Sequence, residues 1–184
     1  MARYMAAWEY VKTYYNVQDR IFIQGYSQGN FPMMNFLRRY SGMIKAALST
    51  GTRASIKAVF DRDSLYPDLH IAEEIARKFG FEDQTGATYE PDKVIGEDTY
   101  ANIIWREDGS PYLPYQIPPL KVVMSQADTT DYQPTYDTIL ALKNGGNRIE
   151  WRILETASHG AVCAGSGFTD EFIMWFDRFK GSDI

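Results

Sequence analysis

The sequence has few of the residues that bind metals or form cross-links. Its 184 residues include one cysteine, Cys163, and two histidines, His70 and His159. A single cysteine excludes a disulfide within the chain and any metal site built from several cysteines.

Long apolar runs and an excess of positive charge are also missing. No stretch approaches the length of a membrane-spanning helix, and residues 1–10 lack the layout of a signal peptide. The net charge is −5, so the surface offers no attraction to nucleic acid or to an anionic membrane. With 45% apolar and 23% charged residues, the composition predicts a soluble globular protein, and the length predicts one domain over residues 1–184.

What the sequence does have is a serine flanked by glycines, between an apolar run and a helical pattern. Gly25 and Gly29 enclose Ser27 in the G-x-S-x-G pattern of a nucleophile elbow. There a strand turns into a helix so sharply that the serine backbone is strained, and we expect both glycines to be needed for the close approach. The elbow exposes the Ser27 hydroxyl at a helix N-terminus and directs the Gln28 N–H to the place where an oxyanion develops. A glycine-rich turn with a merely structural serine is the alternative.

The pattern around this motif is that of an α/β fold. Residues 2–15 carry apolar side chains at helical spacing, and Ile21–Gln24 and Met43–Ser49 are short apolar runs typical of buried strands. Helices that alternate with such strands indicate a parallel sheet, because parallel strands need crossover connections. In the helix expected after Ser27, Pro32 falls in the second turn, where it removes a backbone donor.

The composition changes over residues 54–119, which we interpret as a mainly helical or irregular insertion before the penultimate strand. Within it, Asp68–Gly80 predicts a helix that ends at Gly80. The insertion also carries aromatic rings that either line an acyl or aromatic pocket or pack the insertion onto the sheet. They are Tyr66, Tyr89, Tyr100, Trp105, Tyr112 and Tyr115.

Regular structure resumes after the insertion. The continuous apolar run Leu120–Ser125 predicts a buried strand, and a helix follows from near Tyr132. Arg148–Leu154 then alternates apolar and charged side chains, which is typical of an outer strand. A last amphipathic helix is predicted from Thr169.

Three residues that follow predicted strands form a candidate catalytic triad: Ser27, Asp128 and His159. A serine hydroxyl is a weak nucleophile until an imidazole takes its proton, and a carboxylate holds that imidazole in the correct tautomer. The carboxyl ends of parallel strands lie at one edge of a sheet, where ligands bind. We therefore expect the three side chains to meet there.

Other polar residues have less suitable positions. Asp131 is a rival for the acid, but it is better placed to cap the helix that begins near Tyr132. His70 falls on the polar side of the insertion helix and is predicted to be at the surface. Cys163 is predicted to be a small, buried packing residue.

With GYSQG, KVVMSQAD and SHG in this order, the whole chain resembles the C-terminal half of an α/β-hydrolase of the esterase and prolyl-oligopeptidase-like type. The resemblance implies a mostly parallel sheet with flanking helices, and a serine hydrolase that cleaves carboxylic esters through an acyl-enzyme without cofactor or metal. Ser27 would be the nucleophile, His159 the base, Asp128 its orienting acid and Gln28 the oxyanion-hole donor. A peptidase of the prolyl-oligopeptidase-like type, or a hydrolase-like binding domain without turnover, is the alternative.

The sequence departs from this family before the elbow, where the family has further strands and a loop that donates a second oxyanion N–H. Here one predicted helix precedes Ile21–Gln24, so that strand has an unpaired edge. Either the chain is a fragment of a longer protein, or the edge pairs with a second copy or with a partner chain. For the substrate we expect a short-chain or aromatic ester, or a short peptide, because no extended aliphatic lid for long lipids is visible.

Overall fold

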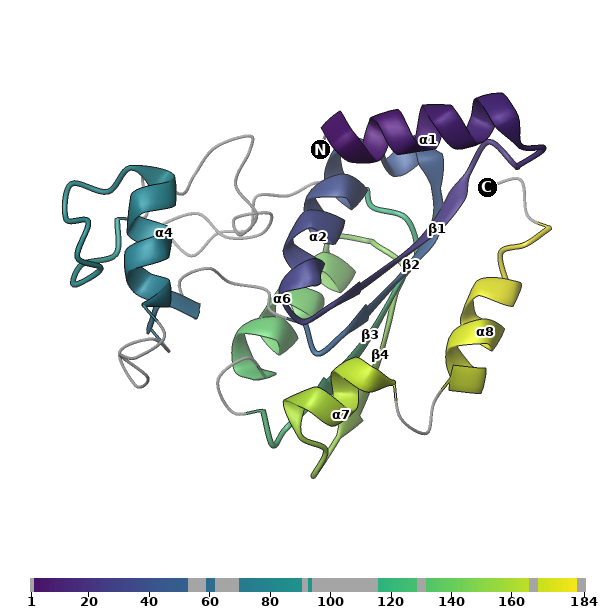
Figure 1. The fold of residues 1–184 in the computed structure, drawn as a ribbon. Helices are drawn as coiled ribbons and strands as arrows, with labels where there is room; N and C mark the ends of the chain where they lie inside the picture. Colours follow the sequence, from purple (N-terminus) through teal and green to yellow (C-terminus); the bar gives the residue numbers. More distant parts are fainter. Residues whose placement is uncertain are drawn as a thin grey trace.

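The computed structural model describes residues 2–52, 59–61, 70–90, 93, 116–128, 132–165 and 169–181. At its centre is a four-stranded parallel sheet in the order β1-β2-β3-β4 (Figure 1). The strands are β1 (Ile21–Tyr26), β2 (Ile44–Thr50), β3 (Leu120–Ser125) and β4 (Ile149–Leu154). The predicted α/β fold with a parallel sheet is therefore confirmed, and each predicted strand is found within two residues of its expected bounds.

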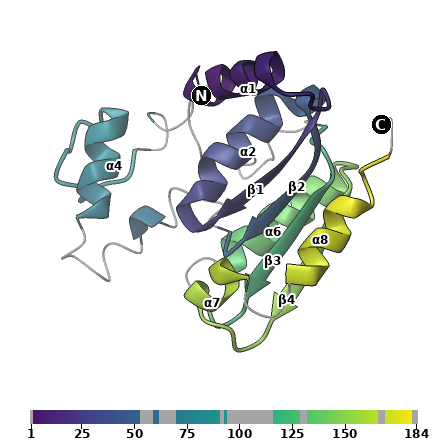
Figure 2. The same ribbon diagram turned by 45° about the vertical axis from the view of Figure 1, so that its right-hand side comes forward.

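Helices cover both faces of the sheet (Figure 2). On one face, α2 (Asn30–Arg39) and α6 (Tyr132–Asn144) pack their apolar side chains against the strands. On the other face lie α7 (His159–Ala164) and α8 (Thr169–Asp177), with Trp175 and Phe179 almost fully buried. Because both faces are covered, every residue of β2 and β3 is buried, and this explains their continuous apolar pattern.

The outer strand β4 alternates apolar and charged side chains, as predicted. Ile149, Trp151 and Ile153 belong to the cluster under α2 and α6, while the intervening Glu150 and Arg152 form ion pairs with Arg178 and Glu171 near α8. The charged residues of this edge strand thus have partners within the chain.

The chain enters the sheet through α1 (Ala2–Tyr14), which matches the helix predicted over 2–15. After β1, a 3₁₀ turn, η1 (Ser27–Gly29), precedes α2, and a second such turn, η2 (Ser41–Met43), precedes β2. Pro32 is therefore the third residue of α2 and lies in its first turn, not in the second as predicted. The first four N–H groups of a helix have no acceptor within it, so proline costs no helical hydrogen bond there.

Between β2 and β3, the described part of the predicted insertion contains α4 (Ile71–Phe79). The helix ends at Gly80, whose φ of +69° is the left-handed conformation that favours glycine at this position. Phe60, Ala72, Ala76 and Phe81 form a separate apolar cluster, against which Phe31 of α2 also packs. The insertion thus has its own small core, and this core contacts the helix that follows the elbow.

The aromatic residues predicted for an insertion pocket are described only in part. Tyr89 packs edge to face on Phe60 and Phe81, and burial raises the pKa of its hydroxyl. The other five aromatic residues, and the predicted start of the insertion at residue 54, lie outside the described residues, whereas its predicted end at residue 119 directly precedes β3. Among the helices described, none is long and apolar enough to cross a membrane.

Candidate active site

The predicted elbow is present between β1 and α2. Ser27 has a φ of +46°, in the left-handed region, where the backbone of any residue other than glycine is strained. A Cβ atom on Gly25 would lie 2.8 Å from Asn30 Oδ1 and 3.1 Å from Asn30 Cα. Gly25 is thus needed for the close approach. Gly29 has a φ of −64°, and no described atom lies within 4 Å of a Cβ built on it. The prediction that both glycines are needed is wrong for Gly29.

Asn30, which the sequence analysis missed, ties the elbow to the neighbouring strand. Its side chain is fully buried, and its Nδ2 donates hydrogen bonds to the carbonyl oxygens of Ser27, at 3.0 Å, and Thr50, at 3.1 Å. Its Oδ1 accepts a hydrogen bond of 2.6 Å from Ser49 Oγ. A polar residue directly after the motif glycine, before an apolar helix, was the available signal.

The structure brings Ser27, His159 and Asp128 together. Ser27 Oγ lies 2.9 Å from His159 Nε2, and His159 Nδ1 is hydrogen-bonded to Asp128 Oδ2. The side chains of His159 and Asp128 are 25% and 12% exposed, so the histidine is accessible while the carboxylate is mostly covered. An ionised carboxylate only accepts hydrogen bonds, so Nδ1 carries the proton and Nε2 is left to accept one from Ser27.

Short local structures hold the acid and the imidazole. Asp128 lies in a turn after β3, where its N–H donates to the Ser125 carbonyl at 3.2 Å and its own carbonyl accepts from the N–H of Tyr132 at 2.9 Å. His159 is the first residue of α7, a helix that the sequence analysis did not predict. The hydroxyl of Ser158 caps this helix by accepting from the N–H of Ala161.

The backbone of Gly51, after β2, lies against the imidazole. A Cβ atom on Gly51 would lie 3.3 Å from His159 Cε1 and 2.5 Å from Cys163 Sγ, and its φ of +53° also favours glycine. Cys163 is only half-buried, which corrects the prediction that it is a buried packing residue. The reason is the short helix α7, which places Cys163 one turn after His159 and on the same side.

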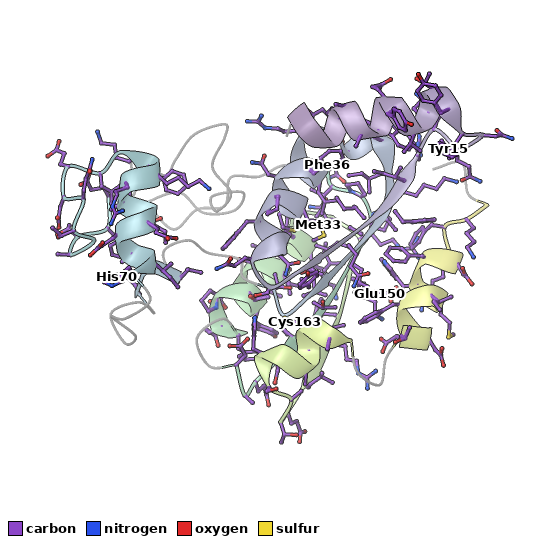
Figure 3. The ribbon with its side chains drawn as sticks, in the orientation of Figure 1. Tyr15, Met33, Phe36, His70, Glu150 and Cys163 are labelled. Atoms are coloured by element: carbon purple, nitrogen blue, oxygen red, sulfur yellow. The ribbon has the colours of Figure 1, made fainter. Side chains whose placement is uncertain are left out.

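The remaining predicted residues lie elsewhere. His70 lies at the surface, as predicted, but it directly precedes α4 in a left-handed conformation and is not part of the helix, which was predicted to begin at Asp68. Its Nδ1 lies 3.5 Å from Glu73 Oε1. Figure 3 shows it well apart from Cys163 in α7. Asp131 is outside the described residues. Gln28 is exposed and directly follows Ser27 in η1. Within the described part of the chain, no group of three or more His, Cys, Asp or Glu side chains is arranged to hold a metal ion.

Comparison with known proteins gives a likeness in structure rather than in sequence. No protein-family model matches the sequence, and no curated protein matches it significantly. An acylaminoacyl peptidase of Pyrococcus horikoshii superposes with a TM-score of 0.60 at 18% identity, over 97% of this chain and 27% of the peptidase. An esterase of Pyrococcus furiosus gives 0.56 at 16% identity, over 95% of this chain and 58% of the esterase.

A third similar structure is described as an α/β-hydrolase. It is an α/β-hydrolase from the metagenome of lagoon sediments at Mar Chica, Morocco, with a TM-score of 0.51 at 14% identity, over 96% of this chain and 68% of that one. The chain has part of an α/β-hydrolase fold. The chain spans about a quarter of the length of the peptidase and less than two thirds of the length of the Pyrococcus furiosus esterase. In the α/β-hydrolase fold the triad follows the chain order serine, acid, histidine, which is the order of Ser27, Asp128 and His159 after β1, β3 and β4.

Proposed function

We propose that the protein is a serine hydrolase that cleaves carboxylic esters through an acyl-enzyme intermediate. The observation that carries this proposal is the hydrogen-bonded series Ser27, His159 and Asp128 at the carboxyl edge of a parallel sheet. The strained backbone of Ser27 adds support, because strain of this kind is concentrated at functional sites.

In the proposed mechanism, Ser27 Oγ attacks the ester carbonyl carbon while His159 Nε2 takes the hydroxyl proton. The carbonyl oxygen becomes an oxyanion, towards which the N–H of Gln28 donates. The imidazolium then gives its proton to the departing alcohol, and the acyl group stays on Ser27. A water molecule, deprotonated by His159, then attacks the acyl carbon, the bond to Ser27 Oγ breaks, and the acid leaves as His159 returns the proton to Ser27 Oγ. Asp128 keeps Nδ1 protonated and stabilises the charged imidazole throughout.

Esters are the favoured substrate class because they make a smaller demand on the oxyanion hole. Within the described residues, Gln28 is the one donor assigned to the oxyanion hole, and losing one oxyanion donor costs about 3 kcal/mol of transition-state stabilisation. An alcohol is a better leaving group than an amine, so an ester tolerates this loss more readily than an amide. Cleavage of short acylated peptides is the second candidate, supported by the likeness to the acylaminoacyl peptidase. Comparing a nitrophenyl ester with the nitroanilide of the same acid separates the two.

A fluorophosphonate probe tests the proposal, because it reacts with an activated serine. We expect the folded chain to be labelled at Ser27, as located by peptide mass spectrometry, and Ser27→Ala to remove the label. Ser41→Ala, which changes a serine in η2 away from the triad, should be labelled like the unaltered protein. Absence of labelling in a chain shown to be folded by circular dichroism would refute the proposal and would favour a hydrolase-like binding domain without turnover.

A further inference from the structure

A cavity of about 300 Å³ opens beside Gln28, between the start of α2 and the insertion helix α4. We propose that this cavity, called here the elbow pocket, holds the acyl group of the substrate and selects short or aromatic acyl chains. Its apolar walls are Phe31, Pro32, Val59, Ile71, Ile75 and Phe79. The inference rests on the proposed function and adds to it which side of the ester the chain recognises.

The position of the elbow pocket relative to the triad decides which part of the substrate it receives. When Ser27 Oγ has attacked, the reacting carbon carries the oxyanion, the leaving alcohol and the acyl chain. The alcohol must face His159, which protonates it, and the oxyanion faces the N–H of Gln28. The acyl chain therefore extends away from His159. Gln28, the neighbour of Ser27, lines the elbow pocket, while Ser27, His159 and Asp128 do not, so the acyl chain would reach the pocket past Gln28.

The walls of the elbow pocket suit an uncharged apolar group. Ile71, Ile75 and Phe79 recur every four residues, so they share one side of α4, and each is only half-buried. Their partly exposed apolar surface would be removed from water by an acyl chain, which favours binding. Glu74 and Lys78 also line the pocket. They have opposite charges one turn apart, so they give no net attraction to a charged acyl group.

The volume indicates the size of the group that the described walls can surround. A value of about 300 Å³ is at the low end for small-molecule sites, and an apolar cavity of roughly half this volume is enough to hold benzene. A phenyl ring or a chain of a few carbons fits between these walls, whereas a long fatty acyl chain would extend beyond them and leave part of its apolar surface in water. The one described tyrosine of the insertion, Tyr89, does not line the pocket and packs behind it in the cluster of Phe60 and Phe81. Among the described residues, the selective surface is thus the apolar side of α4, and Tyr89 is not part of it.

A series of p-nitrophenyl esters with one leaving group and different acyl chains tests the inference on the full chain. For the unaltered protein, kcat/KM should rise from acetate to hexanoate and phenylacetate and should fall at dodecanoate. Ile71→Trp fills the pocket and should lower kcat/KM for hexanoate and phenylacetate by about tenfold or more, since each methylene in an apolar pocket is worth about tenfold or more in discrimination. Turnover of acetate should change much less. Ile75→Ala, which enlarges the pocket, should shift the preferred chain to greater length.

Arg77→Trp is the matched control, because it adds the same ring to an exposed position of α4 that does not line the pocket. It should leave the acyl preference unchanged. In a second series, acetate esters of alcohols of increasing size, Ile71→Trp should have little effect. If Ile71→Trp changes the preference among alcohols, or lowers turnover of all acyl chains equally, the inference is overturned while the proposed function stands. If the folded, unaltered chain is not labelled at Ser27 and hydrolyses no acetate ester, the proposed function and the inference about the elbow pocket are both refuted.

Discussion

The side-chain amide of Asn30 donates a hydrogen bond of 3.0 Å to the main-chain carbonyl of Ser27, the residue with the strained backbone in the elbow. The same amide nitrogen reaches the Thr50 carbonyl at the end of β2. A left-handed conformation costs a residue other than glycine about 1–2 kcal/mol. The buried amide therefore helps to hold Ser27 in a conformation that the isolated chain would avoid, and it ties the elbow to the strand beside it.

We predict that Asn30→Asp destabilises the elbow. Aspartate has the shape of asparagine but cannot donate when ionised, and it would bury a negative charge against the carbonyl oxygens of Ser27 and Thr50. The free energy of unfolding should fall by about 3 kcal/mol, because a buried polar group is left unsatisfied and a charge is added. Urea unfolding measures this loss, and fluorophosphonate labelling of the folded fraction should also slow. Asn144→Asp, an exposed change at the end of α6, is the control and should cost less than about 1 kcal/mol. Unaltered stability and labelling in Asn30→Asp would contradict this role.

The three candidate catalytic residues should behave as one unit in mutants. Ser27→Ala and His159→Ala should each remove most turnover, and the double change should add little, because neither residue accelerates the reaction without the other. Asp128→Asn should be nearly as damaging, since it leaves the imidazole in the wrong tautomer. Initial rates with p-nitrophenyl acetate measure all four variants.

Asp131→Asn tests the choice of acid. Asp131 is predicted to cap a helix, so this change should cost only about 1 kcal/mol of stability and leave kcat nearly unaltered. Loss of activity in a folded Asp131→Asn protein would show that Asp128 is not the acid of the triad.

The parts of the fold that follow from local pattern could be predicted from the sequence. The strand Leu120–Ser125 was found because its apolar run is buried on both faces. The strand before Ser27 was found from the apolar run Ile21–Ile23, although Gly25 is its one buried residue, so the expectation of a buried strand is wrong for β1. The alternation of apolar and charged side chains in β4 was visible because one face of the strand packs in the core while the other forms ion pairs. In each case the neighbours along the chain carry the information.

The parts that depend on contacts between distant residues could not be predicted. Nothing near Asn30 in the sequence reveals that Thr50 accepts its hydrogen bond, and nothing near Gly51 reveals that His159 and Cys163 lie against it. The helix α7 has only six residues, too few to show a clear helical period. The elbow pocket lies between two separate segments of the chain, so the composition of the insertion alone pointed to its tyrosines.

A half-buried ion pair on the α8 side should make stability depend on pH. Lys121 Nζ, in the buried strand β3, lies 2.6 Å from Glu171 Oε1, and Arg152 also bonds to Glu171. Burial opposes ionisation of Glu171, but the hydrogen bonds from Lys121 and Arg152 outweigh it and hold its pKa below the ordinary value. A carboxyl group whose pKa is lower in the folded state binds fewer protons there. Its stabilising contribution is therefore complete above the pKa of the unfolded chain and is lost as pH falls through the folded pKa.

We accordingly predict that Glu171→Gln lowers the free energy of unfolding by about 2 kcal/mol at pH 7, because the buried ammonium of Lys121 loses its charged acceptor. The difference between the variant and the unaltered protein should shrink as pH falls below about 4, where glutamate in unfolded chains takes up its proton. Urea unfolding between pH 7 and pH 3 measures it. Asp177→Asn removes an exposed ion pair with Lys180 and should cost under about 1 kcal/mol. A difference for Glu171→Gln that does not vary with pH would rule out this account.

The edge strand β1 differs from the opposite edge in how it is protected. Within the described residues β1 pairs only with β2, and an apolar groove of about 340 Å³ runs beside it between α1 and α2. Ile21, Ile23, Met33 and Phe36 are among the residues that line the groove, and Figure 3 shows Met33 and Phe36 on α2. At β4, by contrast, the charged residues Glu150 and Arg152 discourage another strand.

We therefore predict that the chain associates through β1, either as a dimer or larger oligomer of its own copies or with a separate chain that contributes a strand. An unpaired edge of a parallel sheet presents free N–H and C=O groups, and the apolar groove beside it gains free energy when it is covered. Light scattering over a range of concentrations should show a mass above 21.1 kDa, and hydrogen exchange of the β1 amides should slow as the protein associates. The β4 amides are the internal control, because their exchange should not depend on concentration. A stable monomer, in which only the amides satisfied by the four-stranded sheet exchange slowly, would count decisively against association at β1.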